Sequence, residues 1–168
     1  RLSKKYFIYA ASSKNIKNKK DIKYINYTDK NLSILKKLKI EYLINCHGKI
    51  SDNNFDEILN DHYSFTKNLI NNINKKFLRK IIHFGTVDEY GNNLSGKDKL
   101  IKERPESNYG QVKLIVTKLI KNFAEKNKID YIIFRVFLVY GLGQKKPRLI
   151  PYLLYCLKNN KIANISDI

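Results

Sequence analysis

Short apolar runs separated by polar segments recur along the whole 168-residue chain. Runs of this length, rich in Ile, Tyr, Phe and Val, predict strands. Five of them are KYFIYA at 5–10, IKYIN at 22–26, EYLIN at 41–45, KIIHFG at 80–85 and YIIFRV at 131–136. Because most of these runs are nearly continuous rather than alternating, the pattern favours strands covered on both faces, as in a parallel sheet.

Other segments carry apolar residues at helical spacing. Residues 54–74 predict one amphipathic helix, and a second stripe runs from Val112 to Phe123 within a helix that starts near 106. LSILKKLK at 32–39 indicates a shorter helix, and PRLIPYLLYCLK at 147–158 indicates a further helix with Pro147 near its beginning. A polar loop containing glycine is expected from about 86 to 107.

Strands that alternate with helices of this length predict right-handed crossovers and a parallel sheet with helices on both faces. The expected fold class is therefore α/β, a doubly wound parallel sheet of the Rossmann-like kind. We expect one domain over residues 1–168, since no internal repeat, low-complexity linker or domain boundary is visible.

The formal net charge of +18 raises nucleic-acid binding as an interpretation. The lysines are scattered through nearly every segment and far outnumber the arginines, which is typical of solvated surfaces, so we expect no nucleic-acid partner. No apolar run is long enough to span a bilayer and no signal peptide is visible, which predicts a cytoplasmic protein without a membrane partner. Cys46 and Cys156 lie far apart and form no ligand set with the three histidines, so neither a metal site nor a disulfide is expected.

Tyr109 and Lys113 stand four positions apart at the start of the second predicted helix. On a helix this spacing places the lysine ammonium near the phenol, where it would favour the phenolate and lower the tyrosine pKa. Alone the motif is weak, and in so lysine-rich a chain the exposed first turn of an ordinary helix is the better interpretation. The context adds Thr86, at the carboxyl end of a predicted parallel strand, where ligands of such folds bind.

Four motifs in this order resemble the extended short-chain dehydrogenase/reductase family, the NAD-dependent epimerase/dehydratase group that acts on nucleotide sugars. Thr86 precedes Tyr90-Gly91 by four residues, Tyr-x-x-x-Lys follows at 109 and 113, and RVFLVYGLGQ at 135–144 is similar to the Arg-x-x-x-Val-Tyr-Gly-x-Gly-Gln segment of the family. YLINCHG at 42–48 looks like the family strand that passes beside the cofactor. The resemblance covers essentially the whole chain.

The resemblance implies that Tyr109 is the general acid/base at a sugar oxygen. Lys113 would lower its pKa and hold the nicotinamide ribose, and Thr86 would bond the same sugar oxygen. It further implies a nucleotide-sugar substrate, with reduction of a 4-keto sugar or epimerisation in polysaccharide or deoxysugar biosynthesis. A homodimer built partly on the Tyr-Lys helix is a candidate assembly.

The chain also departs from the family pattern. The Gly-x-x-Gly-x-x-Gly fingerprint of the first family strand is absent and there is no methionine, so we expect a fragment whose sheet is split where that central strand would lie. We expect most of the substrate-binding region to lie beyond residue 168. Dehydratases of the family carry two carboxylates where this chain has Val87 and Asp88, which disfavours elimination of water.

Residues for the cofactor and substrate follow from the same alignment. The turn after the first predicted strand offers hydroxyls and a lysine rather than an acidic residue, so NADP is favoured over NAD, although a solvated turn explains the lysine equally well. The expected cofactor-binding residues are Ser12, Lys14, Asn26, Cys46, His47, Gly48, Tyr109, Lys113 and Val136. The expected substrate-binding residues are Asp88, Leu138 and Arg148; a basic cluster at 145–148 is otherwise ordinary surface.

Two alternatives remain open. A noncatalytic relative could keep the fold for nucleotide binding, although it would have no reason to retain Thr86, Tyr109 and Lys113 together. A basic nucleic-acid-binding protein is the less favoured alternative. His62, on the apolar face of its predicted helix, is interpreted as a packed or boundary histidine rather than a ligand.

Overall fold

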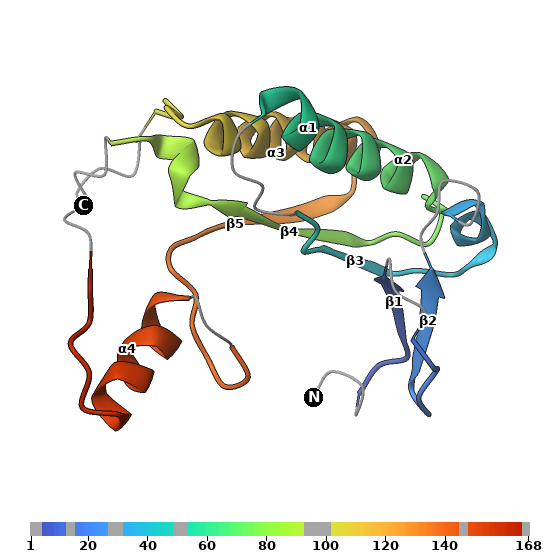
Figure 1. Cartoon of the computed structure of the whole chain (residues 1–168). Coiled ribbons are helices and arrows are strands. Elements are labelled where there is room, and N and C mark those ends of the chain that lie inside the picture. The colour runs from blue at the N-terminus through green and yellow to red at the C-terminus, as the bar shows by residue number, and fades with distance from the viewer. Residues whose placement is uncertain are drawn as a thin grey trace. The chain divides into compact units, whose positions relative to one another are not determined.

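The computed structural model describes residues 5–12, 16–26, 32–48, 54–92, 102–144 and 148–165. The chain divides into two compact units, Arg1–Arg135 and Val136–Ile168 (Figure 1). The first unit contains nearly all the strands and the candidate acid/base residues. None of the helices in these ranges is long and apolar enough to cross a membrane.

The strands form two separate sheets. β1 (Ile8–Ser12) pairs in parallel with β2 (Ile22–Asn26), and the register runs from Ile8 opposite Ile22 to Ser12 opposite Asn26. β3 (Tyr42–Asn45), β4 (Lys80–Thr86) and β5 (Asp130–Val136) form the second sheet in the order β3-β4-β5, with β3 parallel to β4. The split expected from the missing glycine-rich strand is therefore present.

The first strand lies later in the chain than predicted. Tyr6 and Phe7 are exposed at 50% and 60%, while the strand continues through the small residues Ala11 and Ser12. Pairing with β2 sets these bounds, and pairing is not visible in the apolar pattern of one strand.

In place of the single predicted helix at 54–74, the structure has three consecutive helical segments. α1 (Phe55–Leu59) leads into a π-helical turn, η3 (Asn60–Ser64), and α2 (Phe65–Asn72) follows. Four buried residues on this run lie four apart, at 58, 62, 66 and 70, and Leu69 is buried beside the last of them. In an α-helix each four-residue step would rotate the face by about 40°. The wider π turn, with its i→i+5 bonding, reduces that drift and keeps the four side chains on one side.

α3 and α4 lie where the sequence predicted helices, whereas two short helices differ from the prediction. η2 (Leu32–Lys37) and η4 (Val87–Tyr90) are 3₁₀-helices, so the predicted helix at 32–39 is shorter and more tightly wound, and the predicted loop begins with a helical turn. α3 (Asn108–Lys126) starts at Ser107, whose Oγ accepts a hydrogen bond from the Gly110 N–H at 3.0 Å. α4 (Leu149–Lys158) belongs to the second unit.

The core of the first unit lies between the β3-β4-β5 sheet and its helices. Ile81 on β4 meets Ile58 on α1 and the α3 stripe of Val112, Val116 and Ile120, and each of these side chains is at most 2% exposed. Burying one such side chain stabilises the fold by about 1.5–3 kcal/mol. A second cluster joins Ile25 on β2 to η2 and to Leu69 on α2.

One face of the three-stranded sheet carries α1, α2 and α3 (Figure 1). Side chains on the other face are exposed, among them Tyr42, Ile44, Ile132 and Phe134 at 38–49%. A helical layer over this second face, predicted by the doubly wound pattern, is not among the residues described for the first unit.

Candidate functional site

Thr86 ends β4 and begins η4. Its side chain accepts a hydrogen bond from the Asp88 N–H at 3.4 Å, and Glu89 returns a bond to the Thr86 backbone, which forms a capping box. Thr86 is 9% exposed, whereas Asp88 is exposed. The cap therefore fixes the backbone at the carboxyl end of β4, where a ligand of a parallel sheet is expected.

Tyr109 and Lys113 lie on the first turns of α3, which packs against β4 and η4. Gly110 makes the close approach possible, because a Cβ built on it would lie 2.6 Å from the carbonyl O of Asp88. Lys113 is only 4% exposed, and its Nζ donates to the carbonyl O of Phe84 at 2.7 Å. The lysine ammonium is thus held two residues before Thr86.

Burial lowers the pKa of Lys113, and the Glu89 and Cys46 side chains oppose this by raising it. A charge in such a place acts on its neighbours through a medium of low polarity, so its influence is stronger than at the surface. Tyr109 is half-buried, packs on the main core and meets the ring of His62 edge to face, with 5.9 Å between ring centroids.

The segment after β3 runs beside this region. Asn45 is 2% exposed; its Oδ1 accepts from the His47 N–H at 3.1 Å and its Nδ2 donates to Thr66 Oγ1 at 3.4 Å. The His47 ring stacks on Phe65 at 3.9 Å. Burial lowers the pKa of His47, while Asp61, whose carboxylate is 3.5 Å away, raises it. Burial also raises the pKa of Cys46, against the effect of Lys113.

A network centred on Glu89 was not predicted from the sequence. Glu89 is fully buried and accepts hydrogen bonds from the Thr86 N–H at 3.0 Å, the Thr117 hydroxyl at 3.1 Å and Arg135 Nε at 2.7 Å. Arg135 also donates to the Tyr90 hydroxyl at 2.8 Å and to Glu103 at 2.6 Å. Burial alone would lower the pKa of Arg135, but the bonds to Glu89 and Tyr90 raise it above its usual range. The Thr-x-x-Glu spacing of a capping box was the available sequence signal.

His83 is a second buried group that the sequence did not single out. It lies on β4 with no exposed surface, and burial, followed by the charge of Lys113, lowers its pKa to about 3. Its imidazole is therefore neutral at physiological pH. In the described part of the chain no cluster of three or more His, Cys, Asp or Glu side chains could hold a metal ion, and both cysteines there are free thiols.

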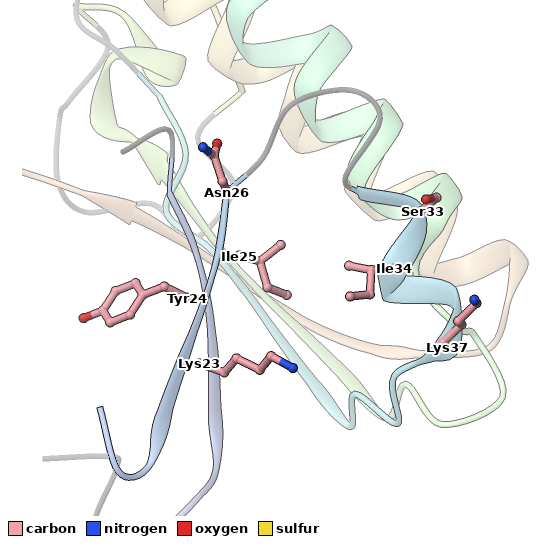
Figure 2. A pocket seen from close by; sticks show the side chains of 7 residues that line it. All are labelled: Lys23, Tyr24, Ile25, Asn26, Ser33, Ile34 and Lys37. Carbon is pink, nitrogen blue, oxygen red and sulfur yellow. The ribbon is translucent and has the colours of Figure 1, made fainter. Parts of the chain in front are cut away.

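The other predicted cofactor residues lie at strand ends. Ser12 ends β1, Asn26 ends β2 and Val136 ends β5, whereas Lys14 lies outside the described residues. Asn26 also lines an open pocket between β2 and η2, together with Ser33 and the lysines at 23 and 37 (Figure 2). Two predicted substrate residues belong to the second unit: Leu138 is 60% exposed, and Arg148 is the exposed N-cap of α4.

The model of the NAD dependent epimerase/dehydratase family matches residues 2–167. The chain belongs to this family. Membership agrees with the resemblance seen in the four motifs and with the parallel α/β fold. A search of the curated proteins with this sequence gave no significant match.

Solved structures with similar folds include several sugar-nucleotide enzymes. The UDP-glucuronic acid 4-epimerase from Bacillus cereus, in complex with NAD, is 23% identical with a TM-score of 0.73 over 85% of this chain and 47% of that one. The UDP-N-acetylglucosamine 4-epimerase from Methanobrevibacter ruminantium M1, in complex with UDP-N-acetylmuramic acid, is 19% identical with a TM-score of 0.70 over 84% and 49%.

A dTDP-glucose 4,6-dehydratase double mutant from Streptomyces venezuelae, with NAD bound, is 16% identical with a TM-score of 0.67 over 84% and 46%. At these identities the likeness shows the fold alone. The chain spans about half the length of the structures it matches.

Proposed function

We propose that the natural protein carrying these residues is an NAD(P)-dependent enzyme that reduces or epimerises a nucleotide sugar. In this proposal Tyr109 is the acid/base, Lys113 its charged partner, and Thr86 a hydrogen-bond donor to the same sugar oxygen. The observation that carries it is the buried Lys113, one helical turn after Tyr109, with its ammonium bonded to Phe84 two residues before Thr86. Family membership supports the same assignment.

The proton chemistry follows from these positions. In this proposal Tyr109 Oη gives a proton to the sugar oxygen or takes one from it, and the positive charge of Lys113, one helical turn along α3, favours the phenolate form. The Thr86 Oγ1 accepts from the Asp88 N–H, which leaves its own hydrogen to donate to the developing oxyanion. Donors held in place before the reaction need no rearrangement when that charge forms.

The ribose end of a dinucleotide site fits the residues present. By the family resemblance Lys113, the segment Cys46 to Gly48, and the strand-end residues Ser12 and Asn26 would hold the dinucleotide, whereas no glycine-rich pyrophosphate cradle occurs in these 168 residues. When bound, the nicotinamide would supply hydride exchange with a sugar carbon. The hydroxyls near Ser12 favour NADP in this proposal, while solved relatives are described with NAD.

The environment of Glu89 favours reduction or epimerisation over dehydration. Elimination of water needs carboxylates that face the substrate, and the oxygens of Glu89 are bonded to Thr86, Thr117 and Arg135 inside the protein. Val87 cannot exchange a proton. Only Asp88 of this group is exposed, so the pair of carboxylates needed for dehydration is incomplete, and Asp88 is assigned to substrate contact.

The experiment is an assay of the natural protein with UDP- and dTDP-sugars in the presence of NADH or NADPH. Stoichiometric loss of NADPH identifies a reductase, and sugar conversion without net loss identifies an epimerase. Tyr109→Phe should lower kcat by about 100-fold or more while nucleotide affinity stays within about twofold. Nucleotide binding without turnover of any sugar would replace the proposal with the noncatalytic alternative. We further propose a cytoplasmic enzyme of polysaccharide or deoxysugar biosynthesis that assembles as a homodimer.

A further inference from the structure

We infer that His62 is a positioning residue for Tyr109, and that its ring is the spacer between Tyr109 and the segment that follows β3. The inference rests on the proposed function for the role of Tyr109, but its geometry stands independently. His62 lies in the π-helical turn η3 and is 1% exposed. π turns inside α-helices frequently mark functional sites.

Three contacts define the spacer. The His62 ring meets the Tyr109 ring edge to face, at 5.9 Å between centroids and an interplanar angle of 85°. The ring also occupies the space beside Gly48, where a built Cβ would lie 2.6 Å from His62 Cε1 and 3.1 Å from Nδ1. The ring of His47 is 6.0 Å away, also edge to face. One imidazole therefore links the end of β3, the η3 turn and the start of α3.

Packing alone does not explain an imidazole here. A buried polar ring carries a desolvation cost that an apolar side chain would avoid. The Asp61 carboxylate lies 3.8 Å from His62 Nε2 and 3.5 Å from His47 Nε2, and the Asp61 carbonyl O is 3.1 Å from His47 Nε2, so one acidic residue lies beside both rings. A buried ring in contact with both a glycine and a phenol restricts where the phenol can lie, and a small displacement of an acid/base lowers the reaction rate steeply.

The backbone at Gly48 supports the same assignment. Its φ of +150° is strained for other residues, and a side chain at this position would require the His62 ring to move. By the family resemblance the segment Cys46 to Gly48 lines the cofactor. Because His62 contacts both Gly48 and Tyr109, a movement of the segment Cys46 to Gly48 would displace the His62 ring and, through it, the Tyr109 side chain.

The test uses the natural protein labelled with ¹³C at tyrosine Cζ, with the Tyr109 resonance assigned through Tyr109→Phe. His62→Ala should shift that resonance, and His62→Phe, which keeps an aromatic ring, should restore it towards the wild-type position. Gly48→Ala should also shift it, because the new methyl group displaces the ring, and this shift should vanish in the His62→Ala background. Gly141→Ala is the matched control, since a Cβ there meets nothing within 4 Å.

The activity readout separates this inference from the proposed function. His62→Ala should lower kcat by about 10- to 100-fold with little change in KM for the nucleotide sugar. A wild-type protein without activity would overturn the proposed function while the resonance shifts still support the spacer. Unchanged resonances in His62→Ala, or equal Gly48→Ala shifts in both backgrounds, would overturn the spacer. If His62→Ala fails to fold, the Gly48→Ala protein decides alone. A Tyr109 resonance that stays at its wild-type position in Gly48→Ala would then overturn the spacer.

Discussion

The Glu89 carboxylate joins β4, α3 and β5 through hydrogen bonds to Thr86, Thr117 and Arg135. Burying a carboxylate costs desolvation energy, so the ion pair itself adds little net stability. Removing the carboxylate is nevertheless strongly destabilising, because its buried partners are then left unpaired. Because one of these partners is the backbone of Thr86, the network also holds the residue proposed to donate to the sugar oxygen.

We predict that Glu89→Gln destabilises the protein by about 3 kcal/mol, because it leaves the Arg135 charge only partly compensated. The measurement is the free energy of unfolding in denaturant. Glu41→Gln is the matched control: Glu41 pairs with Arg79 at 3.3 Å, but its side chain is 51% exposed and that of Arg79 72%. Its loss should cost less than about 0.5 kcal/mol. Equal losses in the two variants would contradict a structural role for the Glu89 network.

His83 predicts an acid-sensitive fold. Its pKa is about 3 when folded, against 6.5 for an ordinary histidine, so the unfolded chain binds a proton that the folded chain refuses. The free energy of unfolding is therefore not reduced by His83 above pH 6.5, and it decreases as the pH drops from 6.5 towards 3. At pH 5 the loss is about 2 kcal/mol. In His83→Leu, the decrease in unfolding free energy from pH 7 to pH 5 should be smaller than in the wild type by about 2 kcal/mol. Identical pH profiles for the wild type and His83→Leu would refute the assignment.

Motif order in the sequence made Thr86, Tyr109 and Lys113 the candidate catalytic residues. Thr86 ends β4, and the other two lie on the first turns of α3, which packs against β4. The network around Glu89 was not predicted, because a buried carboxylate looks like any surface carboxylate in a sequence until its partner, 46 residues away, is brought beside it. His62 was correctly interpreted as packed. Its neighbours Gly48 and Tyr109 come from different elements, so no local spacing could reveal the contact.

The start of α3 depends on one glycine. Alanine is the better helix former by about 1 kcal/mol, which would favour Gly110→Ala. A methyl group at this position would lie 2.6 Å from the Asp88 carbonyl O, however, and that backbone is fixed by the Thr86 cap. Overpacking of this kind costs about 1–3 kcal/mol.

We therefore predict a net loss of thermal stability in Gly110→Ala, measured by circular dichroism. Asn122→Ala, an exposed site on the same helix, should instead raise the melting temperature slightly, since nothing opposes the gain in helix propensity. A higher melting temperature for Gly110→Ala would mean that the η4 backbone moves away from α3 to make room for the methyl group.

Helices and strands were predicted well where the apolar period decides them. β2 has the predicted bounds, and α3 follows the stripe from Val112 to Phe123. The π turn at 60–64 was missed because a spacing of four fits an α-helix as well over a short stretch. β1 was displaced because its bounds depend on pairing with β2, an interaction between segments rather than within one.

For the whole chain, the sequence predicted both the parallel α/β fold and the division into two sheets. The division followed from the absent glycine-rich strand, which the family order places between the two groups of strands found here. The π turn and the buried polar contacts required coordinates, because they arise only when the elements pack.

We predict that the polypeptide of residues 1–168, by itself, binds no dinucleotide with micromolar affinity. The pyrophosphate of such cofactors is bound by a glycine-rich turn at a helix N-terminus, and the sequence contains no such turn. Isothermal titration with NADPH and with NADH measures this directly. A micromolar dissociation constant for either nucleotide would show that the strand ends at Ser12 and Asn26 suffice.

The second face of the β3-β4-β5 sheet, which carries no helix among the residues described for the first unit, affects how these experiments are interpreted. Aromatic and branched side chains such as Tyr42, Ile44 and Phe134 meet solvent there even when the polypeptide is folded. Environment-sensitive dyes that fluoresce on apolar surfaces should therefore bind polypeptide 1–168 before any melting begins. Their high starting signal would resemble an unfolded sample, so heat-induced changes should be followed through amide absorption instead.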